Sequence, residues 1–114
     1  MKILDKIITA NELKELSDNM LGDLVKAVVD VEKEIIAFDA ELHSDLEALL
    51  LEKGSNQENL WGINFYPDDA DDEDFIEFDS MINLRPNQNN RTRSVDSFET
   101  QQEIINVVNK WIKR

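Results

Sequence analysis

Residues 24–42 of this chain read LVKAVVDVEKEIIAFDAEL, and this stretch decides the fold class. Residues 24–31 and residues 35–42 are rich in Val, Ile and other apolar side chains, a composition that predicts two strands. Only Glu32-Lys33-Glu34 separate them, which is a connection short enough for a β-hairpin. We therefore expect an antiparallel sheet that contains this hairpin.

A helix is predicted on each side of the hairpin. Before it, Thr9 and Glu12 have the spacing of a capping box, in which each side chain binds the free backbone N–H of the other residue. One apolar helical face follows, formed by Leu13, Leu16, Met20 and Leu21. After the hairpin, Ser44 and Glu47 repeat the capping spacing, so we expect Ser44 to cap a second helix that ends at Gly54.

The second half of the chain adds two further strands and a last helix. Residues 59–66 and 75–84 are predicted strands, and residues 68–74 between them are a loop with six carboxylates in seven positions. A polar loop, residues 87–94, leads to Ser97, which we expect to cap the last helix. The apolar residues of that helix recur at helical spacing: Ile104, Ile105, Val107, Val108, Trp111 and Ile112.

The predicted fold is one α+β domain over residues 1–114, in the order β-α-β-β-α-β-β-α. Side chains alternate along a strand, and each strand has one apolar side. An antiparallel sheet with all three helices on its apolar face satisfies this pattern. The expected core contains Leu49, Trp61, Phe78, Ile82, Val108 and Trp111.

The opposite face of this sheet is predicted to be polar. By alternation it collects Asp39, Glu41, Asn64, Tyr66, Glu77, Asp79, Asn83 and Arg85. Two interpretations are open, a solvated face and a shallow binding site. Gly62 fits the second, because a glycine in a strand leaves space for a ligand or for another backbone segment, and it fits a β-bulge equally well.

The overall composition limits the partners and the location of the protein. Twelve basic and 25 acidic residues give a net charge of −13, which repels nucleic acid phosphates and anionic lipids. Solubility accounts for such a charge, and so does a basic protein partner or mimicry of nucleic acid. No apolar run is long enough to span a membrane, cysteine is absent, and charges interrupt the N-terminal residues too early for a signal peptide. We expect a cytoplasmic protein.

Three residues near the end of the hairpin are candidates for catalysis. Asp39 and Glu41 lie two residues apart, as a pair of proton-transfer groups could, and His43 is the only histidine. A lone histidine beside carboxylates is a weak metal site, and the acidic loop lacks the glycine and glutamate of a calcium loop. We therefore expect no metal and no cofactor.

A cationic patch stands out against this acidic background. Arg85, Arg91 and Arg93 lie close together in sequence with no acidic residue between them, and arginine forks match carboxylates and phosphates. They either neutralise nearby acidic residues or bind an anion or a partner. Because Arg85 is the only cation of its predicted strand, we expect it to form an ion pair with Glu41 or Asp39.

Several phrases of the chain resemble a family of small prokaryotic proteins of unknown function. They are Val28-Val29-Asp30-Val31-Glu32, Glu41-Leu42-His43, Leu60-Trp61-Gly62-Ile63-Asn64, Phe78-Asp79-Ser80-Met81-Ile82-Asn83-Leu84-Arg85-Pro86 and Asn90-Arg91. The resemblance implies a stand-alone domain and no particular activity. The acidic loop at residues 68–74 departs from the pattern of that family.

The sequence favours a binding module over an enzyme. The module would recognise a protein partner or a small anion through Asn64, Asp79, Asn83, Arg85, Arg91 and Arg93. The alternative is a small enzyme acting on a phosphorylated or glycosidic substrate, in which Asp39 or Glu41 would move a proton.

Overall fold

The computed structural model describes residues 1–19 and 22–114, so the predicted helix positions Met20 and Leu21 lie outside the described residues. The helices are α1 (Ala10–Asn19), α2 (His43–Glu52) and α3 (Phe98–Trp111). The strands are β1 (Lys2–Ile3), β2 (Ile8–Thr9), β3 (Val25–Asp30), β4 (Ile35–Phe38), β5 (Leu60–Phe65), β6 (Ile76–Glu77) and β7 (Ile112–Lys113). Within the described part of the chain, no helix has the length and apolar character needed to cross a membrane.

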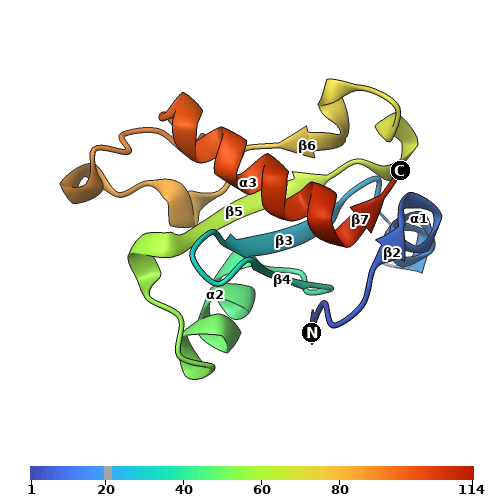
Figure 1. Cartoon of the computed structure of the whole chain (residues 1–114), viewed down its shortest axis with the longest axis horizontal. Coiled ribbons are helices and arrows are strands. Elements are labelled where there is room, and N and C mark those ends of the chain that lie inside the picture. The colour runs from blue at the N-terminus through green and yellow to red at the C-terminus, as the bar shows by residue number, and fades with distance from the viewer. Residues whose placement is uncertain (20–21) are drawn as a thin grey trace.

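The main sheet has five strands in the order β1-β4-β3-β5-β6, and every neighbouring pair is antiparallel. The predicted hairpin is β3 and β4, with Val28 opposite Ala37. The strand that the predicted order places before the first helix, over residues 2–8, is divided in two, because β1 extends the main sheet while β2 pairs in parallel with β7 after the last helix. The α+β class is confirmed, and the order of the elements is close to the predicted one (Figure 1).

One face of the sheet is covered by α3 and α1. Val25, Ala27 and Val29 of β3 point to this face and are fully buried. They pack with apolar residues of β5 and of the two helices, namely Trp61, Ile63, Phe65, Leu13, Ile104, Val107 and Val108. The ribbon shows α3 lying across the strands on this side (Figure 1).

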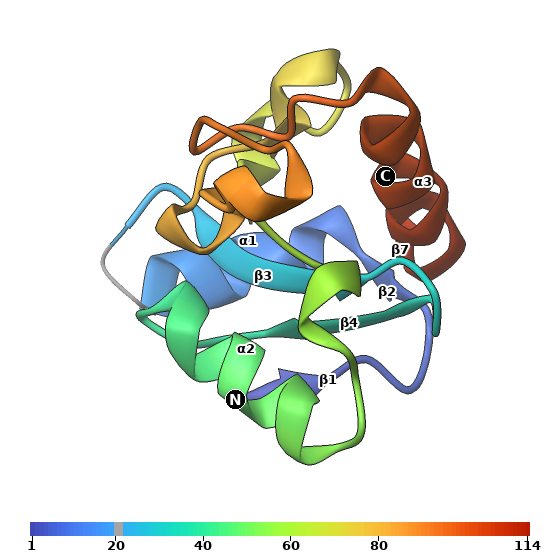
Figure 2. The ribbon, with the colours of Figure 1, turned by 90° about the vertical axis from the view of Figure 1, so that its left-hand side faces the viewer.

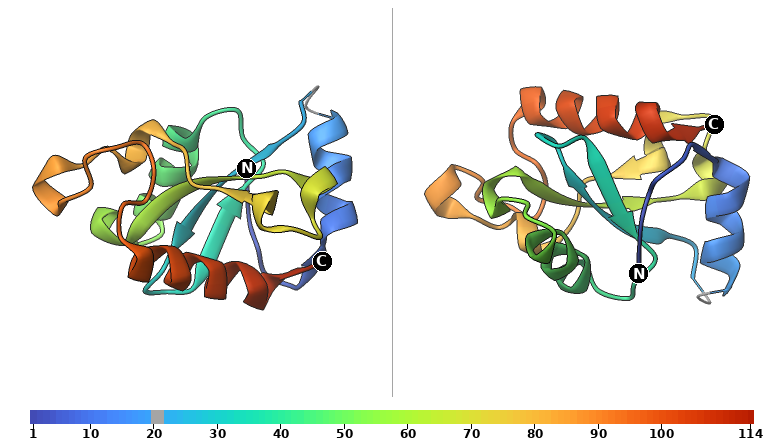
Figure 3. Two further views of the ribbon diagram at one scale, coloured as in Figure 1. Left: turned by 90° about the horizontal axis from the view of Figure 1, so that it is seen from above. Right: turned by 60° about the horizontal axis from the view of Figure 1, so that its bottom comes forward.

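The second helix lies on the opposite face, which corrects the expectation that all three helices share one face. Leu46 and Leu50 of α2 pack on Val28, Ala37 and Leu60. The strands lie between α3 and α2 in Figure 2 and in the right-hand view of Figure 3. The reason is that the central strand β3 has apolar residues at consecutive positions, so both of its faces require cover.

The last predicted strand, residues 75–84, is much shorter than expected. Only Ile76 and Glu77 pair with β5. The chain then leaves the sheet, and the hydroxyl of Ser80 caps a one-turn 3-10 helix at Met81–Asn83. Residues 80–94 run beside β5 without forming a ladder, and this segment builds the candidate site.

The predicted core is confirmed in part. Trp61 and Val108 are buried on the α3 side, and Phe78 and Trp111 pack against the same cluster while half-buried. Leu49 and Ile82 pack on the α2 side instead. Their predicted place was wrong because the alternation rule was extended past Glu77 and because α2 was placed on the face of α3.

Candidate functional site

A row of polar side chains crosses three strands beside the start of α2. Lys26 of β3 lies opposite Asn64 of β5, and Asn64 lies opposite Glu77 of β6. Side chains paired across antiparallel strands in this way point to the same face. The polar face predicted from alternation is therefore present, but only next to the start of α2 and not over the whole sheet.

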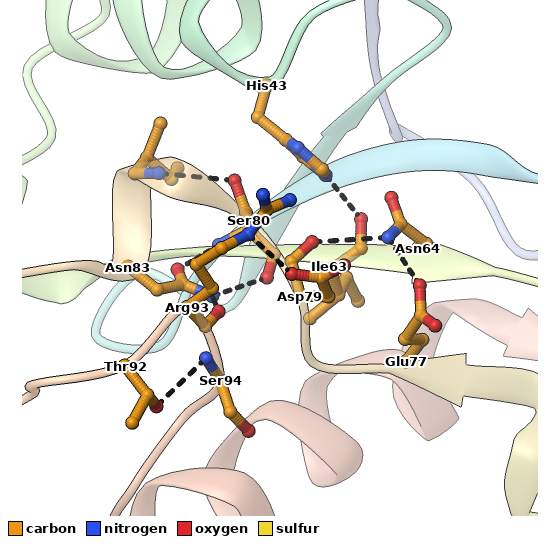
Figure 4. Close-up of polar contacts among 12 residues, drawn as sticks. His43, Ile63, Asn64, Glu77, Asp79, Ser80, Asn83, Thr92, Arg93 and Ser94 are labelled. Carbon is orange, nitrogen blue, oxygen red and sulfur yellow. Dashed lines mark hydrogen bonds and ion pairs between the residues drawn. The ribbon is translucent and has the colours of Figure 1, made fainter.

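His43 is the first residue of α2 and contacts the central part of β5. Its Nε2 lies 2.8 Å from the carbonyl oxygen of Ile63 (Figure 4). Because a carbonyl only accepts, we assign the ring proton to Nε2, which leaves Nδ1 with a lone pair. Burial lowers the pKa of His43 from 6.5, so the imidazole is mostly neutral near pH 7.

Asn64 is buried in the middle of the row and links β5 to the residues around β6. Its Nδ2 donates to Glu77 Oε1 at 2.8 Å and to the carbonyl oxygen of Asp79 at 3.2 Å (Figure 4). The hydroxyl of Tyr66 donates to the same Glu77 oxygen at 3.0 Å, and burial raises the pKa of Tyr66. Within residues 1–19 and 22–114, Asn64 Oδ1 has no hydrogen-bond partner.

The free edge of β5 is closed by a side chain instead of a strand. Asn83 Oδ1 accepts from the backbone N–H of Gly62 at 2.8 Å, and Asn83 Nδ2 donates to the carbonyl of Gly62 at 2.9 Å. The Asn83 amide thus occupies the position that a neighbouring strand would take. Asn83 is fully buried, and Nδ2 also donates to the carbonyl oxygen of Arg93 at 3.0 Å.

The space beside Gly62 is filled by the chain itself. A Cβ on Gly62 would lie 2.5 Å from Ser80 Cβ and 2.6 Å from Ser80 Oγ. The sequence left a ligand, another backbone segment or a bulge open as interpretations, whereas the structure places the side chain of Ser80 in this space.

Arg85 binds backbone carbonyls at the same edge. Its guanidinium donates to the carbonyl oxygen of Leu60 at 2.7 Å and to that of Gln57, and it stacks 4.3 Å from the ring centre of Trp61. Among the described residues Arg85 forms no ion pair, so the pairing predicted with Glu41 or Asp39 is not formed. Burial lowers the pKa of Arg85, although the guanidinium keeps its charge near neutral pH.

Asn90 holds the loop that carries the remaining arginines. Its side chain is buried and donates to the carbonyl oxygens of Asn83 and Ser94, each at 2.7 Å, and accepts from the backbone N–H of Asp96 at 2.8 Å. The loop is therefore ordered by its own polar side chains.

Arg93 projects from this loop toward the start of α2. Its Nε donates to Asp79 Oδ1 at 2.8 Å in a half-exposed ion pair (Figure 4). Its carbonyl oxygen accepts from Ser80 N and from Asn83 Nδ2, each at 3.0 Å. The backbone carbonyl of Arg93 is thus hydrogen-bonded to buried groups, while the side-chain bond to Asp79 is made by Nε and not by either Nη group.

A small cleft lies between the start of α2 and residues 80–93. Its volume is about 190 Å³. The polar residues that line it are Lys26, His43, Ser44, Ser80 and Arg93. The apolar ones are Leu42, Met81 and Ile82. Among the described residues no Asp or Glu lines this cleft, although 25 of the 114 residues are acidic.

The start of α2 differs from the prediction in a way that matters for the cleft. The helix begins at His43, its cap residue is Leu42, and no side chain caps it. Ser44 is thus inside the first turn, and its predicted role as a cap was wrong. Uncapped N–H groups at a helix start carry partial positive charge, and the first turn of α2 also contains the acidic residue Asp45.

Four of the residues proposed from the sequence meet at this place, His43, Asn64, Asp79 and Arg93. Asp39 and Glu41 do not line the cleft. Asp39 follows β4 with a φ of 69°, and the exposed Glu41 contributes only its carbonyl oxygen, which accepts from Lys26 Nζ at 2.9 Å.

The other three proposed residues, Asn83, Arg85 and Arg91, have different surroundings. Asn83 and Arg85 are buried against β5, as described above. Arg91 is exposed and lies outside the lining of the cleft, with its backbone N–H bonded to Asp96 Oδ2 at 2.7 Å. Their proposed binding role stays a prediction.

Sequence reasoning missed Lys26 and Ser80. Lys26 is the only cation of β3, whose other residues are apolar except for Asp30 at its end, and that isolation was a usable signal. Ser80 had none, because its position depends on the chain leaving the sheet after Glu77.

Within the part of the chain that the structure describes, no three His, Asp or Glu side chains are grouped so that they could hold a metal ion.

Comparison with curated proteins and with solved structures finds no match for this chain. A family model does match, over residues 2–111, and its description is "Protein of unknown function (DUF5674)". Because the match covers nearly all of the sequence, the chain belongs to the DUF5674 family.

Proposed function

We propose that the protein is a binding module that recognises an anionic group in the cleft at the start of α2. The observation that carries this proposal is the composition of the lining. Two cations, Lys26 and Arg93, and two hydroxyl side chains, Ser44 and Ser80, line the cleft without any carboxylate. In a chain with 25 acidic and 12 basic residues, a cleft lined by two cations and no carboxylate is not expected by chance.

The donors at this place suit a carboxylate or a phosphate. Charged donors form hydrogen bonds to anions that are stronger than neutral ones. The uncapped start of α2 adds backbone N–H groups with the same preference. Asp79 supports the proposal because its bond to Arg93 Nε leaves the outer edge of the guanidinium for a ligand.

The size of the cleft favours binding over catalysis. Pockets for cofactors and small substrates usually measure about 300–1,000 Å³ and enclose most of the ligand. A volume of about 190 Å³ admits a single charged group. The enzyme alternative, with Asp39 or Glu41 as proton-transfer groups, has less support because neither residue lines the cleft.

The test is an NMR titration of the ¹⁵N-labelled protein with sodium phosphate and, separately, with sodium acetate at constant ionic strength. We expect saturable shifts of the amide signals of His43, Ser44 and Arg93. The double variant Lys26→Gln, Arg93→Gln should lose them, and Arg91→Gln is the matched control that should keep them.

Linear, unsaturable shifts would contradict the proposal. Shifts that persist in the double variant would do so as well, because the anion would then bind elsewhere.

A further inference from the structure

We propose that the group recognised by this cleft is a single carboxylate side chain of a protein segment, flanked in that segment by apolar side chains. This inference rests on the anion site proposed above and adds the identity of its ligand. Three properties of the cleft support it: its net charge, its rim and its volume.

The charge of the cleft matches one negative charge. Lys26 and Arg93 contribute two positive charges. The carboxylate of Asp79, which pairs with Arg93, cancels one of them. His43 adds no charge near pH 7, because burial lowers its pKa. A doubly charged phosphate would exceed this balance and would also meet twice the repulsion from a protein of net charge −13.

The rim of the cleft is apolar and exposed. Leu42 is 55% exposed and Met81 is 61% exposed, and both line the cleft. Leu84 is 42% exposed and lies outside the lining of the cleft, directly after the 3-10 helix that begins at Met81. Free inorganic anions do not use such a surface. An acidic residue between apolar residues uses both the donors in the cleft and the apolar rim.

The small volume of the cleft leaves the remainder of such a ligand outside. About 190 Å³ holds one side chain, and the backbone of the partner would lie over Leu42 and Met81. Methionine is a flexible side chain that adapts to different apolar partners. The arrangement is that of a surface that recognises a short peptide motif.

The acidic loop of a second copy of this chain is a competing occupant. Residues 68–74, Asp-Asp-Ala-Asp-Asp-Glu-Asp, offer many carboxylates but no large apolar side chain. The apolar rim therefore favours a different protein, and a peptide with the sequence of this loop is a built-in control.

The experiment selects random peptides displayed on phage against the immobilised full chain, with a parallel selection against Lys26→Gln, Arg93→Gln. We expect the pool enriched on the wild-type protein to share Asp or Glu next to Leu, Ile, Met or Phe, and the double variant to enrich no such pool. Melting temperatures of the proteins would be measured alongside.

Selected peptides are then synthesised and their affinities measured. Replacing the acidic residue by its amide should weaken binding about tenfold, which corresponds to the loss of one charge-assisted contact. Met81→Ser should weaken binding by a similar factor, and Phe98→Ser is the control, because Phe98 is 72% exposed but lies outside the cleft. Phosphoserine in place of the acidic residue should not improve binding.

The outcomes separate this inference from the proposed function. If phosphate and acetate bind as proposed but no peptide is enriched, the site is a small-anion site and the inference fails. It also fails if the enriched peptides lack an acidic residue, if phosphoserine binds tenfold more tightly, or if the loop peptide binds as well as the selected ones. If neither anions nor peptides bind, the proposed function itself fails.

Discussion

At Gly62 two distant parts of the chain lie in close contact. The side chain of Ser80 occupies the space where a Cβ would be, so Gly62→Ala forces a contact of 2.5 Å to Ser80 Cβ. Overpacking of this kind costs about 1–3 kcal/mol of the free energy of unfolding. Urea denaturation of the variant would measure the loss.

The control for this prediction is Gly54→Ala, which is strained for a different reason. Gly54 has a φ of 98°, and the nearest atom to its Cβ position is Lys33 Nζ at 3.4 Å. Adding Ser80→Gly removes the contact at position 62 and also the bond from Ile82 N to Ser80 Oγ, so it should recover part of the stability of the Gly62 variant and lower that of the Gly54 variant. If Ser80→Gly changed the stability of the Gly62 and Gly54 variants equally, the contact with Ser80 would not be the cause of the loss in the Gly62 variant.

His43 should make stability depend on pH in a defined direction. Burial lowers its pKa in the folded state, whereas the unfolded chain takes up the proton near pH 6.5. As the pH falls below 6.5, protons therefore favour the unfolded state until the folded-state pKa is reached. We expect the free energy of unfolding to fall over this window.

Two measurements check the prediction for His43. The NMR titration of its Cε1–H should give a pKa below 6.5. His43→Gln keeps an N–H for the carbonyl of Ile63 and cannot titrate, so the difference between wild type and variant isolates His43 from the many carboxylates. A pKa above 6.5 would mean that the environment of the imidazole is different from the one described.

At the scale of single elements, the starts of α2 and α3 differ although both carry a serine. Ser97 caps α3, and its Oγ accepts from the N–H of Thr100 at 3.3 Å. Ser44 lies inside α2 and caps nothing. We expect Ser97→Ala to cost about 1 kcal/mol and Ser44→Ala less than about 0.5 kcal/mol. Thermal or urea denaturation would measure both losses. A larger loss for Ser44→Ala than for Ser97→Ala would mean that Ser44 caps its helix.

The edge of β5 depends on one side chain. Asn83→Asp keeps the acceptor for Gly62 N but removes the donor for the carbonyls of Gly62 and Arg93. The new carboxylate would also face these two oxygens in a buried place, and we expect a loss of at least about 2 kcal/mol.

Asn87 is exposed, and Asn87→Asp is the matched control for Asn83→Asp. We expect it to change the free energy of unfolding by no more than about 0.5 kcal/mol. Equal stability of the two variants in urea would mean that water replaces the Asn83 amide at the strand edge.

At the scale of the whole molecule, charge governs association. A net charge of −13 repels a polyanion over the whole surface, while the cleft offers only a local excess of positive charge. We therefore expect no mobility shift of DNA or RNA by micromolar protein at about 0.15 M salt, where repulsion is only partly screened. A shift under these conditions would refute this view of the surface.

The sequence by itself determined the elements that depend on neighbours in the chain. The apolar, β-branched composition of residues 24–31 and 35–42 and the short connection between them are enough to predict the β3–β4 hairpin. The helical spacing of Ile104, Val107 and Val108, together with the cap at Ser97, is enough to predict α3. These patterns are local, because a strand repeats every two residues and a helix every three to four. The polar character of the site was predictable for the same reason.

Only the tertiary structure decided how these elements share the two faces of the sheet. Val28 and Val29 are both apolar, so β3 needs cover on both sides, and no local pattern states which helix provides it. Likewise, nothing near Asn83 indicates that its amide closes the edge of β5, and nothing near Arg93 indicates that it meets Lys26 and His43. The physical reason is that burial and hydrogen-bond satisfaction are conditions on the whole fold, and residues far apart in the chain meet them together.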